Sequence, residues 1–261
     1  MTAIYAVPVS FVVDKKSIFL RELTAQDELT VSEVGTIGAI QLINRLSQHA
    51  MRDKEPPLQA ESLVAADRDR LLAAIYQKTY SDFLQSTVHC TACKEPFDLD
   101  FSLSALINHT QQSDGDGKDL GVVVKEQGWY ELPNGASFRL PTGDDELATM
   151  GLPPQSNGAF LLERCVQKGD ISLVGQEVEA AMAQIAPVLA TELSAQCPEC
   201  GHEQAVYFDI QSFLLARLMQ EKKQIIWEIH RLASVYHWAH SEIVNLPRSL
   251  RKSYVALMDT E

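Results

Sequence analysis

Cys90-Thr91-Ala92-Cys93 and Cys197-Pro198-Glu199-Cys200 are the two stretches that decide the fold. Each has two residues between its cysteines, a spacing that forms a tight knuckle and lets both thiolates reach one metal ion at about 2.3 Å. Gly201 follows the second pair, where a knuckle ends in a positive φ angle, and Lys94 takes the equivalent place after the first. Together the four cysteines predict one closed, structural Zn²⁺ site, because four thiolates leave no coordination position open for a substrate.

The two pairs are far apart in the chain, with 103 residues between Cys93 and Cys197, whereas ribbon pairs are usually separated by roughly 15–20 residues. Closing the longer loop costs only about 2 kcal/mol more, and a structural zinc contributes on the order of 10–16 kcal/mol. Phe97-Asp98-Leu99 after the first pair resembles Phe208-Asp209-Ile210 after the second. We therefore expect two halves of one zinc ribbon, and the alternative is two unrelated redox or incidental pairs.

The rest of the chain predicts an α+β fold that is rich in helix. Residues 4–22 alternate like a hairpin, and Pro133-Asn134-Gly135 marks a second hairpin turn. Thr142 is a candidate helix cap, and the polar residues 111–118 are expected to form a mobile loop. Helices are predicted from apolar spacing over 36–46, 61–83, 103–107, 157–166, 176–193 (divided by Pro187) and 210–236, with short helices after them.

Three segments follow from this pattern. Residues 1–93 would hold the N-terminal hairpin, helices and the first knuckle. Residues 94–196 would form an insertion subdomain of a hairpin and helices. Residues 197–261 would hold the second knuckle, the long helix and a C-terminal helical hairpin.

Composition restricts the function. A formal charge of −13 disfavours a nucleic-acid or anionic-membrane binder. The apolar start Met1–Val13 has no basic beginning and contains Pro8, so we expect a strand rather than a signal peptide. Two C-x-x-C pairs in this context indicate a reducing, cytoplasmic setting and metal chemistry. The sequence contains no Gly-rich phosphate loop, G-x-S-x-G or H-E-x-x-H motif, so we expect no enzymatic activity.

Several single residues have a simple interpretation and a more specific one. Cys165 lies in an apolar helix and is expected to be buried and inert rather than nucleophilic. His89 and His202 adjoin ligand cysteines and could replace one, although four cysteines already fill the shell. Three histidines lie near one another in the C-terminal region, and we expect them to be surface or interface residues rather than a metal cluster: His230, His237 and His240.

The C-terminal stretch interleaves aromatic, apolar and basic residues. It could be a helix-turn-helix or an RNA platform, but its excess of positive charge is small. Aromatic residues and arginines are also enriched at protein interfaces, so a protein partner is favoured. The candidate partner-binding residues are Trp227, Tyr236, Trp238, Ile243, Leu246, Pro247, Arg248, Arg251 and Tyr254.

Three stretches resemble phage tail proteins. His237–Arg248, with Trp238, Glu242-Ile243 and Leu246-Pro247, resembles the W-S-x-x-E-I-x-x-L-P ending of tail assembly proteins, although Ala239 stands where serine is more usual. Phe138–Gly143 and the ribbon halves resemble the T-even phage baseplate hub assembly chaperone family, in the two-C-x-x-C form found in phage-tail-like contractile injection systems. Leu20–Glu28 is similar to segments near the start of tail chaperones.

The resemblance implies a non-enzymatic assembly factor or component of the baseplate hub of a contractile phage tail or injection system. Its partners would be hub, spike or wedge proteins, with no small-molecule substrate, nucleic acid or membrane. It would act in the cytoplasm during assembly, and its retention in the particle stays open. The alternatives are a zinc-ribbon nucleic-acid-binding or transcription-associated factor and, third, a zinc enzyme with a ligand other than cysteine.

Overall fold

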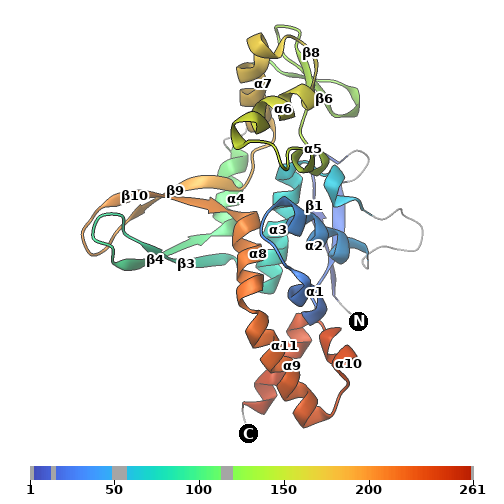
Figure 1. The fold of residues 1–261 in the computed structure, drawn as a ribbon, viewed down its shortest axis with the longest axis vertical. Helices are drawn as coiled ribbons and strands as arrows, with labels where there is room; N and C mark the ends of the chain where they lie inside the picture. The colour runs from blue at the N-terminus through green and yellow to red at the C-terminus, as the bar shows by residue number, and fades with distance from the viewer. Residues whose placement is uncertain (1–2, 13–15, 49–57, 113–119, 260–261) are drawn as a thin grey trace.

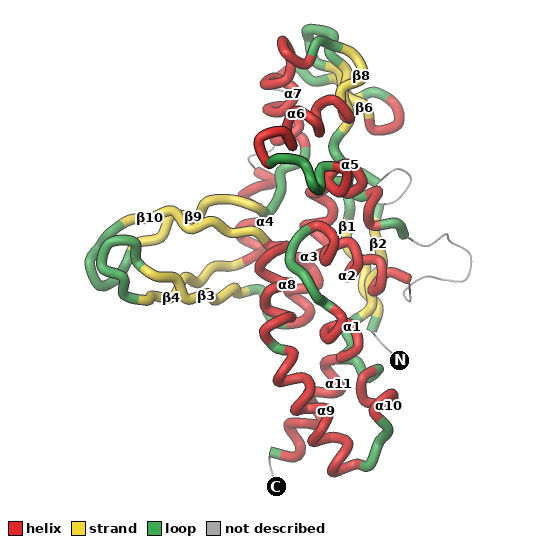
Figure 2. Tube along the Cα trace, viewed as in Figure 1, coloured by secondary structure: helices red, strands yellow, loops and turns green. Residues whose placement is uncertain are grey.

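The computed structural model describes residues 3–12, 16–48, 58–112 and 120–259. Figure 1 shows a central body from which three parts project: a thin arm of strands, a lobe and a helical unit. The arm consists of β3, β4, β9 and β10, the lobe of β5–β8 with α6 and α7, and the C-terminal unit of α9–α11. Helix predominates everywhere except in the arm and in the small sheets (Figure 2), which agrees with the expected helix-rich α+β fold.

The first half of the chain runs from a hairpin through helices into the arm. Its elements are β1 (Ile4–Pro8), β2 (Ser17–Arg21), α1 (Ala25–Thr30), α2 (Thr36–Gln48), the short 3₁₀ helix η1 (Ala60–Ser62), α3 (Ala65–Thr79), β3 (Phe83–His89), β4 (Pro96–Ser102) and α4 (Leu103–Gln112).

The second half follows the same order and ends in the C-terminal unit. Its elements are β5 (Val123–Val124), η3 (Glu126–Gly128), β6 (Trp129–Glu131), β7 (Ser137–Arg139), α5 (Gly143–Ala148), α6 (Pro154–Cys165), β8 (Val166–Lys168), α7 (Ile171–Ile185), β9 (Ala190–Gln196), β10 (Glu203–Asp209), α8 (Ile210–Gln220), α9 (Lys222–Tyr236), α10 (His240–Val244) and α11 (Arg248–Met258).

The two halves are an internal repeat. Each half has a hairpin, a short capped helix, two further helices, and a strand–knuckle–strand–helix unit. The strand–knuckle–strand–helix units correspond at a constant offset of 107 residues, as from Phe83 to Ala190 at their starts and from Leu103 to Ile210 at their last helices. The expected match of Phe97 with Phe208 is therefore displaced by four residues. Phe101 is the counterpart of Phe208, and their rings meet edge-on at 5.0 Å.

The hairpins of the two halves end in the same capped helix. Arg21, at the end of β2, is followed by Thr24, whose side chain caps α1 in a reciprocal capping box with Asp27. In the second half Thr142 and Asp145 form the same capping box at the start of α5. In each half the strand-end arginine donates to the buried aspartate, Arg21 to Asp27 at 2.8 Å and Arg139 to Asp145 at 2.9 Å.

Four apolar clusters hold the described part of the molecule together. The largest fills the body, where helices α2 and α3 pack on the β1–β2 hairpin and α8 packs on α2 and α3. A second cluster fills the lobe and a third the C-terminal unit. The fourth is small and lies in the arm, between its two hairpins, around Cys90, Phe97, Ala195 and Cys197.

The structure differs from the sequence prediction at several helix boundaries. The predicted helix 61–83 is η1 and α3, and its last residue already belongs to β3. The predicted helix 176–193 ends at Ile185, before Pro187, and the following residues start β9. The predicted helix 210–236 is interrupted at Glu221, between α8 and α9.

Other expectations concern loops and segment boundaries. The predicted loop 111–118 lies mostly outside the described residues, as does most of the turn at 14–16. The segment boundaries at 93/94 and 196/197 fall inside the β3–β4 and β9–β10 hairpins, so the structural units of the arm run across them.

Candidate metal centre and C-terminal surface

Each cysteine pair sits in the turn of one arm hairpin. In the first turn the Cys90 amide donates to the Glu95 carbonyl at 2.9 Å, and the Lys94 amide donates to the Cys90 carbonyl at 3.0 Å. The second turn repeats both bonds at 2.9 Å, from Cys197 to His202 and from Gly201 to Cys197. Lys94 and Gly201 have nearly the same φ, 68° and 71°. The sequence therefore builds the same knuckle twice, as the C-x-x-C spacing predicts.

Packing of the two hairpins brings all four thiols to one point. Their sulfur atoms lie within 4.8 Å of one another, with Cys90 3.6 Å from Cys200 and Cys93 3.7 Å from Cys197. A tetrahedron with metal–sulfur bonds of about 2.3 Å has edges of about 3.8 Å, whereas a disulfide would need about 2.05 Å. The geometry fits one metal ion bound by four thiolates.

The site is placed at the far end of the arm and is partly shielded from solvent. Cys90 and Cys197 are buried, Cys93 is half-buried, and Cys200 is exposed. Backbone hydrogen bonding from Cys93, and then from Ala92, lowers the pKa of the Cys90 thiol to about 6. A backbone hydrogen bond from Glu95 lowers the pKa of the Cys93 thiol, but burial and hydrogen bonds with the other three thiols outweigh it and raise this pKa. Cys90 therefore loses its proton more readily than Cys93 and gives the thiolate, which is the form that binds a metal.

The other cysteine and the adjacent histidines lie outside this group. Cys165 is buried in the lobe at the end of α6, and burial raises the pKa of its thiol to about 11, so it remains protonated. The ring of His202 bonds the Thr91 hydroxyl at 3.0 Å, and His89 is exposed on β3 opposite Pro96. Among the described residues, the four cysteines are the one group of His, Cys, Asp or Glu side chains close enough to hold a metal ion.

The predicted aromatic residues of the C-terminal unit mostly pack against one another. Tyr236 stacks on Trp238 at 4.9 Å, and Tyr254 meets both rings edge-on. Ile243 is fully buried in the same cluster. Trp227 differs, because it is 48% exposed on the outer face of α9 with the Arg231 guanidinium 4.5 Å from its ring. Of the predicted aromatic partner residues, Trp227 is thus the most exposed, while Tyr236, Trp238 and Tyr254 are partly buried.

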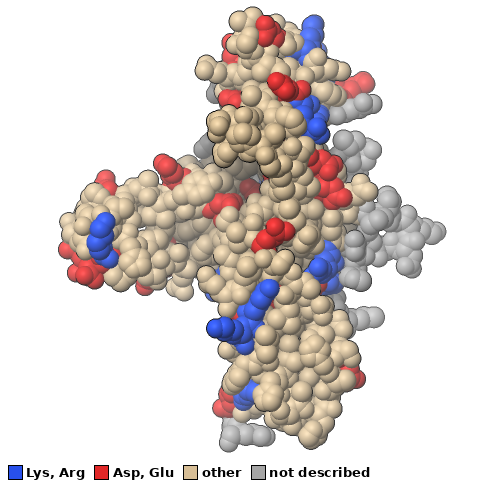
Figure 3. Space-filling model, viewed as in Figure 1, with Lys and Arg blue, Asp and Glu red and all other residues tan. Residues whose placement is uncertain are grey.

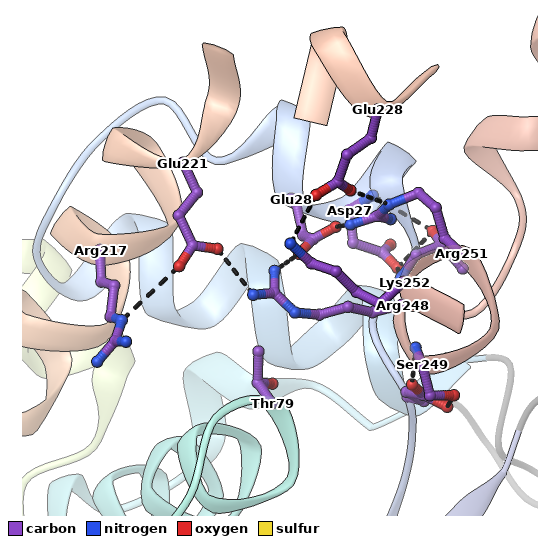
Figure 4. Close-up of polar contacts among 12 residues, drawn as sticks. Asp27, Glu28, Thr79, Arg217, Glu221, Glu228, Arg248, Ser249, Arg251 and Lys252 are labelled. Carbon is purple, nitrogen blue, oxygen red and sulfur yellow. Dashed lines mark hydrogen bonds and ion pairs between the residues drawn. The ribbon is translucent and has the colours of Figure 1, made fainter. Parts of the chain in front are cut away.

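The two predicted arginines are buried in an ion cluster that joins α1 to the C-terminal unit (Figure 4). Arg248 donates to Glu28 and, at 2.8 Å, to Glu221. Arg251 donates to Glu28 at 2.6 Å and to Glu228 at 2.9 Å. Their charge is neutralised inside the protein and is not displayed to solvent. Leu246 and Pro247 lie in the turn before α11, where Pro247 bridges to Thr24.

The sequence prediction missed a second, equivalent contact. Arg68, the fourth residue of α3, donates to Glu146 at 2.7 Å, just as Arg251, the fourth residue of α11, donates to Glu28. Just before each of these helices a residue bridges to the capping threonine: Val64 to Thr142 and Pro247 to Thr24.

The signal that could have found this contact is the repeat of R-x-x-T-x-x-D-E-L at 21–29 and 139–147.

The described helices include none with the length and apolar character needed to cross a membrane. Comparisons with protein-family models, with curated proteins and with solved structures each found no match.

Proposed function

We propose that this protein is a non-enzymatic, partner-binding assembly factor or component of the baseplate hub of a contractile tail or injection system, with a structural Zn²⁺ clasping its arm. The observation that carries the binding role is the closed set of four thiols. It uses every ligand position of a tetrahedral ion and offers none to a substrate.

Zinc is the metal that this ligand set favours. Four thiolates at tetrahedral spacing suit Zn²⁺, and soft sulfur ligands disfavour Mg²⁺ and Ca²⁺. The purified protein should contain about one zinc per chain. In a cobalt-substituted sample, the absorption spectrum should report four sulfur ligands. A mixed sulfur–nitrogen spectrum, or an exchangeable water on the metal, would favour the zinc-enzyme alternative.

Two observations support a protein partner over a nucleic acid. The arginines that suggested a basic surface, Arg248 and Arg251, are neutralised by buried glutamates. The C-terminal unit instead exposes apolar side chains, and among them Trp227 is an aromatic residue of the kind that anchors protein interfaces. The contractile-tail context rests on the resemblance of residues 20–28, 138–143 and 237–248 to tail assembly proteins.

Co-expression with the hub, spike and wedge proteins of one contractile system, followed by a pull-down, tests the proposal. A retained tail protein is expected, and Trp227→Ala should reduce its retention at least fivefold, which is about 1 kcal/mol. Leu173→Ala is the matched control, because Leu173 is 78% exposed but lies on α7 in the lobe. Retention of none of these proteins, together with salt-sensitive binding to DNA or RNA, would reject the proposal in favour of the nucleic-acid alternative.

A further inference from the structure

The outer face of the β9–β10 hairpin displays an aromatic ring beside a carboxylate. Tyr207 on β10 is 69% exposed, and Glu192 on β9 is its direct cross-strand partner. Opposed residues of an antiparallel pair have Cβ atoms about 4.5–5.5 Å apart. The ring and the carboxylate therefore form one small surface that faces solvent.

The arm carries an excess of negative charge that the protein does not neutralise. Its two hairpins contain a single basic residue, Lys94, if histidines are left out. Its carboxylates are Glu95, Asp98, Asp100, Glu192, Glu199, Glu203 and Asp209. Within the described part of the chain none of these seven forms an ion pair, whereas Glu28, Asp145 and Glu228 each pair with one or more cations. Figure 3 shows acidic side chains along the visible face of the arm and one basic patch at its tip.

The fold does not require this aromatic side chain. The internal repeat places Asp100 at the position equivalent to Tyr207 and Gln85 at the position equivalent to Glu192, where they also face each other across the strands. At inward-facing positions, by contrast, the two hairpins carry the same type of residue, as with Phe101 and Phe208. Tyr207 and Glu192 thus distinguish one outer face of the arm from the other, although both hairpins have the same structural role.

The arm also places this face away from the body and keeps it in a fixed conformation. It projects from the body with no other described element over its end (Figure 1), while the sulfur cluster and the small apolar cluster join its two hairpins. A surface that is already ordered loses little conformational entropy when a partner binds.

We propose that the outer face of β9–β10, centred on Tyr207 and Glu192, docks a cationic segment of a partner protein. An arginine or lysine of that segment stacks on the Tyr207 ring and pairs with Glu192, while the other carboxylates of the arm attract it over a longer range. Nucleic acid does not fit, because its phosphates would be repelled. This inference deepens the proposed function, on which it rests, by naming the chemistry of one partner.

Binding of a fluorescent octa-arginine peptide to the full-length, metal-loaded protein at 150 mM salt tests the inference without any tail protein. We expect Tyr207→Ala and Glu192→Gln each to raise Kd about threefold. The matched controls are Phe83→Ala and Asp100→Asn, which remove an exposed aromatic ring and one charge from the β3–β4 hairpin. Both should raise Kd by clearly less than threefold, because Asp100 contributes only long-range attraction, and metal content and circular dichroism should show that every variant is folded.

Three results would overturn the inference. The first is no binding of the peptide. The second is an equal loss in Asp100→Asn and Glu192→Gln, which would indicate general attraction to an acidic protein. The third is a concentration-dependent dimer, seen by sedimentation and abolished by Tyr207→Ala, which would make this face a contact between two copies of the chain. None of these results bears on whether hub proteins are retained through Trp227, so the two proposals fail independently.

Discussion

Gly201 and Lys94 end the two knuckles with the same left-handed backbone, but only glycine adopts it without strain. A side chain at φ near +70° costs roughly 1–2 kcal/mol. A Cβ added to Gly201 would meet no atom within 4 Å, so the backbone angle alone sets the cost. We expect Gly201→Ala to lower the free energy of unfolding by about 1 kcal/mol in chemical denaturation. Gly135→Ala, also at positive φ with open space but outside the arm, should cost a similar amount without changing metal affinity.

Each ligand cysteine should be required for metal binding, and the fifth cysteine should not. Cys197→Ser replaces a buried thiolate with a poor zinc ligand, so the zinc content should fall and the melting temperature with it, because structural zinc contributes on the order of 10 kcal/mol. Cys165→Ala is the control and should keep one metal per chain, although the change in packing lowers stability somewhat. A Cys197→Ser protein with unchanged melting temperature and no zinc would contradict the structural role.

Asp69 links stability to pH near neutrality. Burial raises the pKa of this carboxyl to about 7, although it accepts the Leu189 amide at 2.8 Å. Because the folded pKa exceeds the unfolded value of about 4, the folded state binds the proton more tightly. The stabilisation is fully present below pH 4 and is lost as the pH rises through 7.

Comparing Asp69→Asn with the wild type tests this linkage. The free energy of unfolding of the wild type should fall relative to that of the variant between pH 5 and pH 8, by up to a few kcal/mol. Asp27 has the opposite effect on the pH dependence of stability. Burial raises the pKa of its carboxyl, but hydrogen bonds from Arg21 and Thr24 outweigh burial and lower it below its usual value. Its contribution to stability is therefore lost only in acid. A constant difference between variant and wild type across this range would show that Asp69 is charged in both states.

Residue identity alone predicted the cluster of four cysteines but not the ion cluster. The C-x-x-C spacing brings two cysteines together at a time through local backbone geometry, so the sequence is sufficient to predict each pair. Arg248 and Arg251 were predicted to lie on a partner surface, but they are buried. The prediction failed because their counter-charge, Glu28, is about 220 residues away in the sequence. No local pattern indicates such a partner. The sequence prediction could have found it only by comparing the two R-x-x-T-x-x-D-E-L stretches.

At the scale of elements, the buried ion cluster should decide how firmly the C-terminal unit is attached. Removing one partner of a buried pair leaves an uncompensated charge and costs about 3–5 kcal/mol. Arg251→Met keeps most of the side-chain volume but leaves Glu28 and Glu228 with fewer cations. It should therefore raise amide hydrogen exchange throughout α9–α11.

The control is Arg231→Ala in the same unit. Arg231 pairs with Asp259, which is 59% exposed, so its loss should cost less than about 1 kcal/mol. Equal effects of the two changes on exchange in α9–α11 would mean that apolar packing, and not the ion cluster, attaches this unit to α1.

Helix prediction failed where a helix passes directly into a strand of the arm. Apolar spacing in residues 61–83 continues past the end of α3 at Thr79, whereas in β3 the exposed Phe83 and Gln85 already alternate with the buried Leu84. The same error extended the helix at 176–193 into β9. Among the described residues, β3 and β9 each pair only with the strand on the other side of their own knuckle. Before the cysteine pair, a short alternation of exposed and buried residues is therefore the local signal of each strand. The hairpin turn at Pro133-Asn134-Gly135, whose chemistry is local, was predicted at the place where β6 and β7 pair.

At the scale of the whole molecule, the repeat shows that each of the two capped helices, α1 and α5, is held by an arginine from another part of the chain. The helix α5 of the second half is held by Arg68 of the first half, and the helix α1 of the first half is held by Arg251 of the C-terminal unit. The position of α7 that corresponds to Arg68, counted as the fourth residue of the helix, is Val174. The lobe therefore lacks this arginine, and within the described chain both capped helices already have their partner.

The four cysteines bring the two halves together at a different place, so removal of the proposed metal should loosen only part of the molecule. Cys90 and Cys93 come from the first half and Cys197 and Cys200 from the second, and they meet at the end of the arm, apart from the apolar clusters of the body and the C-terminal unit. On chelation, hydrogen exchange should rise together in β3–β4 and β9–β10, because each hairpin has only the other to pack against beyond the body. Exchange in α9–α11 should stay unchanged, since its own cluster and the Arg251 pairs remain. A rise in one hairpin alone would show that the arm is not a single unit. A rise across all elements would show that the metal holds the entire fold, and the role of the cysteines would then extend well beyond the arm.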